Sequence, residues 1–154
     1  MNIRKAVEND LARIAEIYVF NNRLYYYPIF QDAAFSFGRL QVASYAKEYR
    51  QEPGALEHTY VYDDGLLKGF VKVEDTEVHK LFVEPAFQSE GIGAALLEFA
   101  VRTLGADHLW VLEKNTRALA FYARHGFVPT GRREPEEGTA EWQMELQRCR
   151  NTQT

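Results

Sequence analysis

The stretch VEPAFQSEGIGAALL, residues 83–97, runs from a strand-like segment through two glycines into an apolar, helix-like segment. A strand that feeds a glycine-containing loop at the start of a helix points several backbone N–H groups, and the positive end of the helix dipole, toward one place. Gly91 and Gly93 carry no side chains, so an anion can approach the backbone closely there. The pattern predicts a phosphate-binding loop, with an ordinary helix start in a mixed α/β domain as the alternative.

Two nucleotide-binding motifs with similar glycines fit this stretch poorly. A dinucleotide fingerprint has an acidic residue about 20 residues further on, which Glu113 supplies, but Leu96 occupies its third glycine position. Too few residues also follow the motif to build the second half of such a fold. A P-loop requires Gly-Lys-Ser/Thr after the glycines, and this tripeptide is absent from the sequence. Another phosphate-bearing ligand is therefore the stronger expectation.

The composition is typical of a soluble globular protein. The 154 residues are 46% hydrophobic and 26% charged, which predicts a single domain over residues 1–154. The formal net charge of −4 gives no electrostatic reason to expect nucleic acid. The N-terminus lacks the apolar core of a signal peptide and no apolar run is long enough for a membrane span, so we expect a cytoplasmic protein. A single cysteine, Cys149, and four scattered histidines predict neither a disulfide framework nor a metal site.

Apolar spacing and turn residues predict the element order β-α-α-β-β-β-α-β-α-β-β. The turn Asp63-Asp64-Gly65 between two β-rich runs is a strong hairpin signal. Asn9 or Asp10 is expected to cap the first helix, whereas the aromatic-rich residues 24–37, interrupted by Pro28, are expected to form a partly buried loop. The expected strands are 3–6, 58–62, 67–73, 77–83, 108–112 and segments around 127–128 and 142–146; the expected helices are about 11–22, 38–50, 92–104 and 115–124.

Two motifs carry a resemblance to a known family. Gln88-x-x-Gly91-x-Gly93, preceded by Leu81-x-Val83-x-Pro85, resembles the acetyl-CoA-binding motif of the GNAT (Gcn5-related N-acetyltransferase) superfamily, and Asn115-x-x-Ala118-x-x-Phe121-Tyr122-x-x-x-Gly126-Phe127 resembles its second motif. The resemblance covers about residues 58–146, and the N-terminal third agrees only in element order. It implies an α+β fold in which helices flank a central, mostly antiparallel twisted sheet whose fourth and fifth strands splay apart. It also implies acetyl-CoA as the acyl donor, without a metal.

The same resemblance implies which residues bind CoA. The pantetheine arm is expected to pair with the backbone of Leu81, Phe82 and Val83, and the pyrophosphate to bind the following loop. The loop of this chain departs from the family. The family often has Arg, Gly and Lys where this chain has Gln88, Ser89 and Glu90, so backbone N–H groups have to supply more of the pyrophosphate binding. Arg102, Lys114, Arg117 and Arg124 remain open as phosphate partners. The implied loop and arm residues are Gln88, Ser89, Glu90, Gly91, Ile92, Gly93, Ala94, Asn115, Ala118 and Tyr122.

Transfer of an acetyl group to an amine requires a deprotonated amine and a proton donor for the leaving thiolate. Tyr122 matches the family tyrosine that stands near the CoA sulfur, so the resemblance implies that it is the general acid. For the base, the resemblance implies Glu77, because several histone acetyltransferases of the family carry a catalytic glutamate at the start of the fourth strand. His79, two residues on, is expected on the same face, and either could take the proton directly or through water. The alternative for Tyr122 is a tyrosine that only packs in the core, and the alternative for Glu77 is a surface carboxylate at the end of a strand.

The acceptor-binding residues are expected in the loop after the first helix, where the family forms part of its acceptor pocket. An aromatic wall can stack on apolar or cationic groups, although such rings can equally fill a core or a homodimer interface. The leading hypothesis is an N-acetyltransferase that acts in a ternary complex on a primary amine of a small molecule or protein. The alternative is a CoA-binding sensor or interaction module without turnover. The expected acceptor residues are Tyr25, Tyr26, Tyr27 and Phe30.

Overall fold

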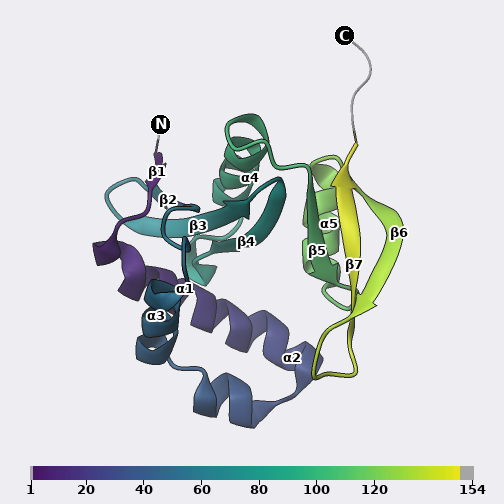
Figure 1. Cartoon of the computed structure of the whole chain (residues 1–154), viewed down its shortest axis with the longest axis horizontal. Helices are drawn as coiled ribbons and strands as arrows, with labels where there is room; N and C mark the ends of the chain where they lie inside the picture. The colour runs from purple at the N-terminus through teal and green to yellow at the C-terminus, as the bar shows by residue number, and fades with distance from the viewer. Residues whose placement is uncertain (1, 150–154) are drawn as a thin grey trace.

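The computed structural model describes residues 2–149, which contain one seven-stranded sheet (Figure 1). The strand order is β1-β2-β3-β4-β5-β7-β6, and every neighbouring pair is antiparallel except β4 and β5. The strands are β1 Ile3–Lys5, β2 Thr59–Asp63, β3 Leu67–Glu74, β4 Glu77–Val83, β5 His108–Leu112, β6 Phe127–Pro135 and β7 Trp142–Arg148. This arrangement confirms the predicted mixed fold with a mostly antiparallel sheet.

The sheet opens between its two parallel strands. β4 pairs with β5 only at Glu77 with His108 and at Val78 with Leu109, after which the two strands separate. On its other edge β4 stays paired with β3 as far as Val83, and β7 covers the far edge of β5. The second half of β4 therefore has a backbone edge that no strand occupies, as the predicted splay requires.

Helices cover both faces of the sheet and enclose two hydrophobic cores. Helices α1 (Leu11–Asn21) and α3 (Val42–Gln51) pack on one face, and α4 (Ile92–Arg102) packs on the other, while α5 (Thr116–Arg124) lies beside β6. Within residues 2–149, no helix combines the length and the apolar character that crossing a membrane requires. The first core contains Ile14, Ile17, Val61 and Phe70; the second contains Val71, Ile92, Leu96, Leu109, Phe127 and Leu146.

The predicted loop at residues 24–37 is wrong, because this segment is mostly helical. Helix α1 continues through a π-helical turn, Asn22–Tyr26, into the short helix α2 (Tyr27–Phe30), and a second π-helical turn spans Ala34–Arg39. Pro28 lies in the first turn of α2, where the N–H that proline lacks has no helical partner in any case. The proline is therefore compatible with a helix start, and the helical path carries the aromatic residues along one wall of the splay.

The expected cap of α1 is also wrong. The Asp10 side chain makes no capping hydrogen bond to α1 and instead accepts from the Val7 N–H at 2.8 Å and from both terminal nitrogens of Arg4 at 2.8 and 2.9 Å. The Arg4 hydrogen bonds lower the pKa of Asp10 against the effect of its burial, and the Val7 N–H adds to this. The carboxylate thus ties β1 to the segment before α1.

Candidate active site

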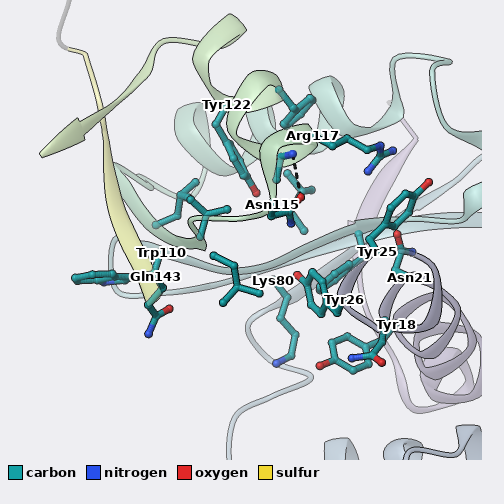
Figure 2. A pocket seen from close by; sticks show the side chains of 18 of the residues that line it. Tyr18, Asn21, Tyr25, Tyr26, Lys80, Trp110, Asn115, Arg117, Tyr122 and Gln143 are labelled. Atoms are coloured by element: carbon teal, nitrogen blue, oxygen red, sulfur yellow. Dashed lines mark hydrogen bonds between the residues drawn. The ribbon is translucent and has the colours of Figure 1, made fainter. Parts of the chain in front are cut away.

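A cavity of about 990 Å³ occupies the space where β4 leaves β5 (Figure 2). Its walls come from segments far apart in the sequence: α1 and the helical segment after it, β4, the 88–94 loop, β5, α5 and the loop between β6 and β7. Both predicted motifs and most of the predicted acceptor residues therefore meet in one space.

The start of α4 lines this cavity with backbone N–H groups. Gly91 is the N-cap residue with a left-handed backbone (φ 84°), and the first intrahelical bond of α4 runs from the Ala95 N–H to the Gly91 carbonyl. The N–H groups of Ile92, Gly93 and Ala94 precede that bond, so the helix itself leaves them without an acceptor. These residues, with Gln88 and Ser89, lie on the cavity wall, whereas Glu90 does not. The arrangement can hold an anion through backbone donors.

The Gln88 side chain joins this loop to α1. Its Oε1 accepts hydrogen bonds from the Tyr25 hydroxyl at 2.6 Å and from the Arg117 guanidinium, which also stacks 4.2 Å from the Tyr25 ring centroid. Its Nε2 donates to the Val83 carbonyl at 3.1 Å and to the Asn21 side chain at 3.3 Å. Gln88 therefore positions the loop through its side chain.

The structure separates the four basic candidates for phosphate binding. Arg117 and Arg124 of α5 line the cavity. Lys114 and Arg102 are not among the lining residues, and each lies next to a carboxylate, at 3.1 Å from Glu141 and 3.3 Å from Glu98 respectively. The two α5 arginines are thus the cations available to an anion at the start of α4.

Tyr122 projects from α5 into the cavity, and its hydroxyl points toward the open space (Figure 2). Among residues 2–149 the hydroxyl has no hydrogen-bond partner, so it can donate to a ligand. Burial raises the pKa of Tyr122 well above its ordinary value, which keeps the hydroxyl protonated. Asn115, at the start of the same helix, accepts from the Ala118 N–H at 3.2 Å and so caps the helix. Asn115 and Ala118 also line the cavity.

The two candidate bases lie at the closed end of the splay. His79 lines the cavity, whereas Glu77 is not one of the lining residues. A bulge at His79 interrupts the strand, because Val73 pairs with Val78 while Lys72 pairs with Lys80. Glu77 and His79 still lie on one face, with 3.7 Å between the Glu77 carboxylate and His79 Nε2, and the bulge changes the alternation only from Lys80 onward.

The same end of the splay holds a chain of histidines and carboxylates. Glu77 lies 3.7 Å from His79 Nε2 and 3.4 Å from His108 Nε2, while His79 Nδ1 lies 3.1 Å from Glu74. Burial opposes the charged form of His108, but its hydrogen bond to Asp107 and the charge of Glu77 raise its pKa overall. Within residues 2–149, no three His, Cys, Asp or Glu side chains are arranged to hold a metal ion.

The aromatic residues after α1 divide into two groups. Tyr25, Tyr26 and Phe30 line the cavity, whereas Tyr27 packs edge-on against Phe37 at 5.1 Å. The cavity also contains residues that sequence reasoning missed, because only the tertiary fold brings them there. These are Tyr18, Lys80, Trp110, Gln143 and the segment 136–141 between β6 and β7.

Comparison with known proteins gives this cavity a family context. The profile of the acetyltransferase (GNAT) domain matches residues 55–129, which include the glycine loop and α5. A solved structure, the PaiA N-acetyltransferase of Thermoplasma acidophilum in complex with coenzyme A, superposes with a TM-score of 0.64 over 94% of this chain and 97% of that chain, at 22% identity. That likeness supports the shared fold.

Two sequence relatives extend the comparison. A peptidyl-lysine N-acetyltransferase, YjaB of Salmonella typhimurium, is 35% identical over 69 residues, which are 45% of this chain and 48% of the relative. An uncharacterized N-acetyltransferase of Archaeoglobus fulgidus is 33% identical over 156 aligned positions, covering 90% of this chain and 97% of the relative. With this near-complete match and the shared fold, the chain belongs to the GNAT family of N-acetyltransferases.

Proposed function

We propose that this protein transfers an acetyl group from acetyl-CoA to a primary amine by direct attack within a ternary complex. One observation carries the proposal: the N–H groups at the start of α4, the unpaired edge of β4 and the Tyr122 hydroxyl open into the same cavity. The N–H groups of α4 can bind a pyrophosphate, and the edge of β4 can pair with an extended arm that contains amides. The Tyr122 hydroxyl can donate to a thioester sulfur. The cavity continues beyond them toward the aromatic wall of the α1 side, where an acceptor can enter.

The chemical step forms one C–N bond and breaks one C–S bond. The neutral amine attacks the thioester carbonyl, and the tetrahedral intermediate then expels the CoA thiolate. Burial raises the pKa of Tyr122 above that of a thiol, so Tyr122 acts chiefly as a hydrogen-bond donor that stabilises the developing thiolate. The amine nitrogen gives up one proton and the CoA thiolate takes up one proton to become the thiol, so the overall reaction is balanced.

Removal of that proton is assigned to the closed end of the splay. His79 lines the cavity, but both of its ring nitrogens face carboxylates, Glu74 at 3.1 Å and Glu77 at 3.7 Å. We propose that a water at the cavity wall takes the proton from the amine and passes it to His79, and that Glu77 is the final proton acceptor. This assignment agrees with the expectation of Glu77 or His79 as base through water.

The acceptor is proposed to be a primary amine of a small molecule or a protein. The relative YjaB is named a peptidyl-lysine N-acetyltransferase, which supports an amine acceptor in general. The aromatic side chains of Tyr25, Tyr26 and Phe30 offer a wall on which an alkylamine can pack.

A CoA-binding module without turnover is the second candidate. It is favoured by the absence of basic side chains at positions 88–90 and by the engagement of Arg117 with Gln88. The two functions differ in one measurement, the release of CoA thiol across a broad panel of amines. A binding module would bind CoA and release no thiol above the background of hydrolysis.

The test of the catalytic proposal uses Tyr122→Phe, with Tyr60→Phe as the matched control. The control substitution removes the same kind of hydroxyl from Tyr60, whose ring packs against Phe99 outside the cavity. Loss of the hydrogen bond to the leaving group is expected to lower kcat about 100-fold in Tyr122→Phe, while calorimetry finds the acetyl-CoA affinity preserved. Full turnover by Tyr122→Phe would remove this role, and no binding of acetyl-CoA by the unaltered protein at near-millimolar concentration would remove the proposed function.

A further inference from the structure

Lys80 places a positive charge on the wall of the cavity that faces α1. The bulge at His79 produces this orientation: Val78, Leu81 and Val83 pack in the core beneath α4, whereas Phe82 packs in the core beneath α1. Strict alternation from Val78 would have placed Lys80 under α4. The bulge turns it instead to the α1 face, where its Nζ lies 5.8 Å from the centroid of the Tyr18 ring.

Lys80 has no counterion of its own within the part of the chain that the structure describes. No carboxylate oxygen of residues 2–149 lies within 4.0 Å of its Nζ. The two nearby acids serve its neighbour across the strand pair, Lys72, whose Nζ lies 2.5 Å from Glu52 and 3.9 Å from Glu74. Desolvation and the charge of Lys72 lower the pKa of Lys80, and the charges of Glu52 and Glu74 offset this only in part. A partly buried ammonium without a counterion is costly, and an anion in the cavity would remove that cost.

The side chain is placed for binding rather than for proton transfer. Figure 2 shows the Lys80 amine directed away from the Tyr122 hydroxyl, on the side of the cavity where the Tyr18 ring lies. A ligand that reacts near Tyr122 can therefore reach Lys80 only with a different part of its structure. The loop between β6 and β7 contributes carboxylates to the same cavity, among them Glu136 and Glu137. The cavity thus offers a cation from β4 and anions from this loop, which suits a ligand that carries both charges.

We propose that Lys80 binds an oxyanion of the acceptor, so that the preferred acceptor is an amine that also carries a carboxylate or a phosphate group. This rests on the proposed acetyl transfer and deepens it by naming the acceptor class. The oxyanion pairs with the Lys80 ammonium, the aromatic wall packs against the intervening carbon atoms, and the amine faces the thioester. Lys80 is therefore a specificity residue for the acceptor and takes no part in the proton transfers.

The experiment compares matched amines with and without the oxyanion. Each amino acid is paired with its decarboxylated amine, and each phosphorylated amino alcohol with the unphosphorylated form, so that the two arms distinguish carboxylate from phosphate. Release of CoA thiol gives kcat/KM for every member. The unaltered protein is expected to prefer the oxyanion-bearing member of one arm at least tenfold, mainly through KM. No preference in either arm would overturn the proposal.

Two variants assign that preference to Lys80. Lys80→Met keeps the length of the side chain without its charge, and Lys80→Arg keeps the charge; Lys47→Met, an exposed site on α3 outside the cavity, is the matched control. Lys80→Met is expected to lose the preference, which Lys80→Arg restores in part and Lys47→Met retains. An unchanged preference in Lys80→Met would overturn the assignment, as would equal losses for both members of a pair.

A binding measurement separates this proposal from acetyl transfer itself. Thermal unfolding with saturating CoA reports acceptor binding without turnover, because a ligand that binds the folded state raises Tm. The oxyanion-bearing amine is expected to raise Tm in the unaltered protein and not in Lys80→Met, even if no thiol is released. No rise with any oxyanion-bearing amine would overturn the proposal, whereas calorimetry with acetyl-CoA alone decides whether the donor site exists.

Discussion

Gly69 offers a stringent test of how the sheet positions the loop at the start of α4. A Cβ at this position in β3 would lie 3.0 Å from the Phe82 backbone oxygen, 3.0 Å from Leu96 Cδ1 and 3.3 Å from Ile92 Cγ2. The two side chains can shift a little, but the Phe82 oxygen is fixed within the β3–β4 pairing. Gly69→Ala therefore forces β3, β4 and α4 apart.

The expected cost follows from two opposing effects. Overpacking of this kind costs about 1 to 3 kcal/mol, and the reduced freedom of the unfolded chain returns about 0.4 to 1 kcal/mol. The middle of these two ranges gives a net loss in the free energy of unfolding of about 1.3 kcal/mol, which lowers Tm by roughly 3 to 5 °C in a chain of this size. Because Ile92 is the first residue of α4, the same displacement is expected to weaken acetyl-CoA binding.

Thermal and urea unfolding of Gly69→Ala, with Gly38→Ala as the control, decide this prediction. A Cβ at Gly38 meets nothing within 4 Å, and its backbone is not left-handed, so this variant makes the same chemical change without the contact. Gly38→Ala is expected to match or exceed the unaltered protein in stability. Equal stability of the two variants would refute the close approach of β3, β4 and α4 at Gly69.

Two further changes probe the loop and the N-terminal ion pair. A Cβ at Gly93 would meet Phe121 at 3.5 Å, which is an ordinary contact, so the stability of Gly93→Ala should stay within about 0.5 kcal/mol of that of the unaltered protein. Calorimetry should nevertheless show CoA bound roughly tenfold more weakly, because the added methyl group obstructs the approach of the ligand to the backbone. Asp10→Asn should cost about 2 kcal/mol at pH 7 in urea unfolding. Since Arg4 and the Val7 N–H lower the folded-state pKa of Asp10, its contribution is present above the unfolded pKa of about 3.9 and is lost as the pH falls through the folded pKa, so the two proteins should converge in acid.

The parts of the site that local sequence predicts are those made by local contacts. The glycine loop depends on the backbone of consecutive residues, and the Asn115 cap joins atoms three residues apart. Such features need no knowledge of the tertiary fold, because the residue types and their spacing already define the geometry. The loop and the cap were therefore predictable from the residues themselves, whereas the splayed pair of strands was expected only from the family resemblance.

The parts that escaped prediction depend on distant contacts or on an irregular backbone. Gln88 meets Tyr25 and Asn21 from 63 and 67 residues away, so this motif residue, which lines the cavity, also bridges the loop to α1 and the turn after it. The helical path through residues 22–39 was hidden by Pro28, which breaks helices in their interior and is tolerated in their first turn. Residue composition alone does not distinguish these two positions.

Two irregularities in a single strand account for both ends of the cavity. The separation of β4 from β5 after Val78 exposes the backbone edge that a CoA arm can use, and the bulge at His79 turns Lys80 toward the acceptor side. A regular strand would bury Lys80 under α4 and remove its charge from the α1 side of the cavity. Because our proposals assign donor and acceptor to different residues of β4 and its following loop, Gly93→Ala should alter CoA affinity without changing acceptor preference, and Lys80→Met should do the reverse.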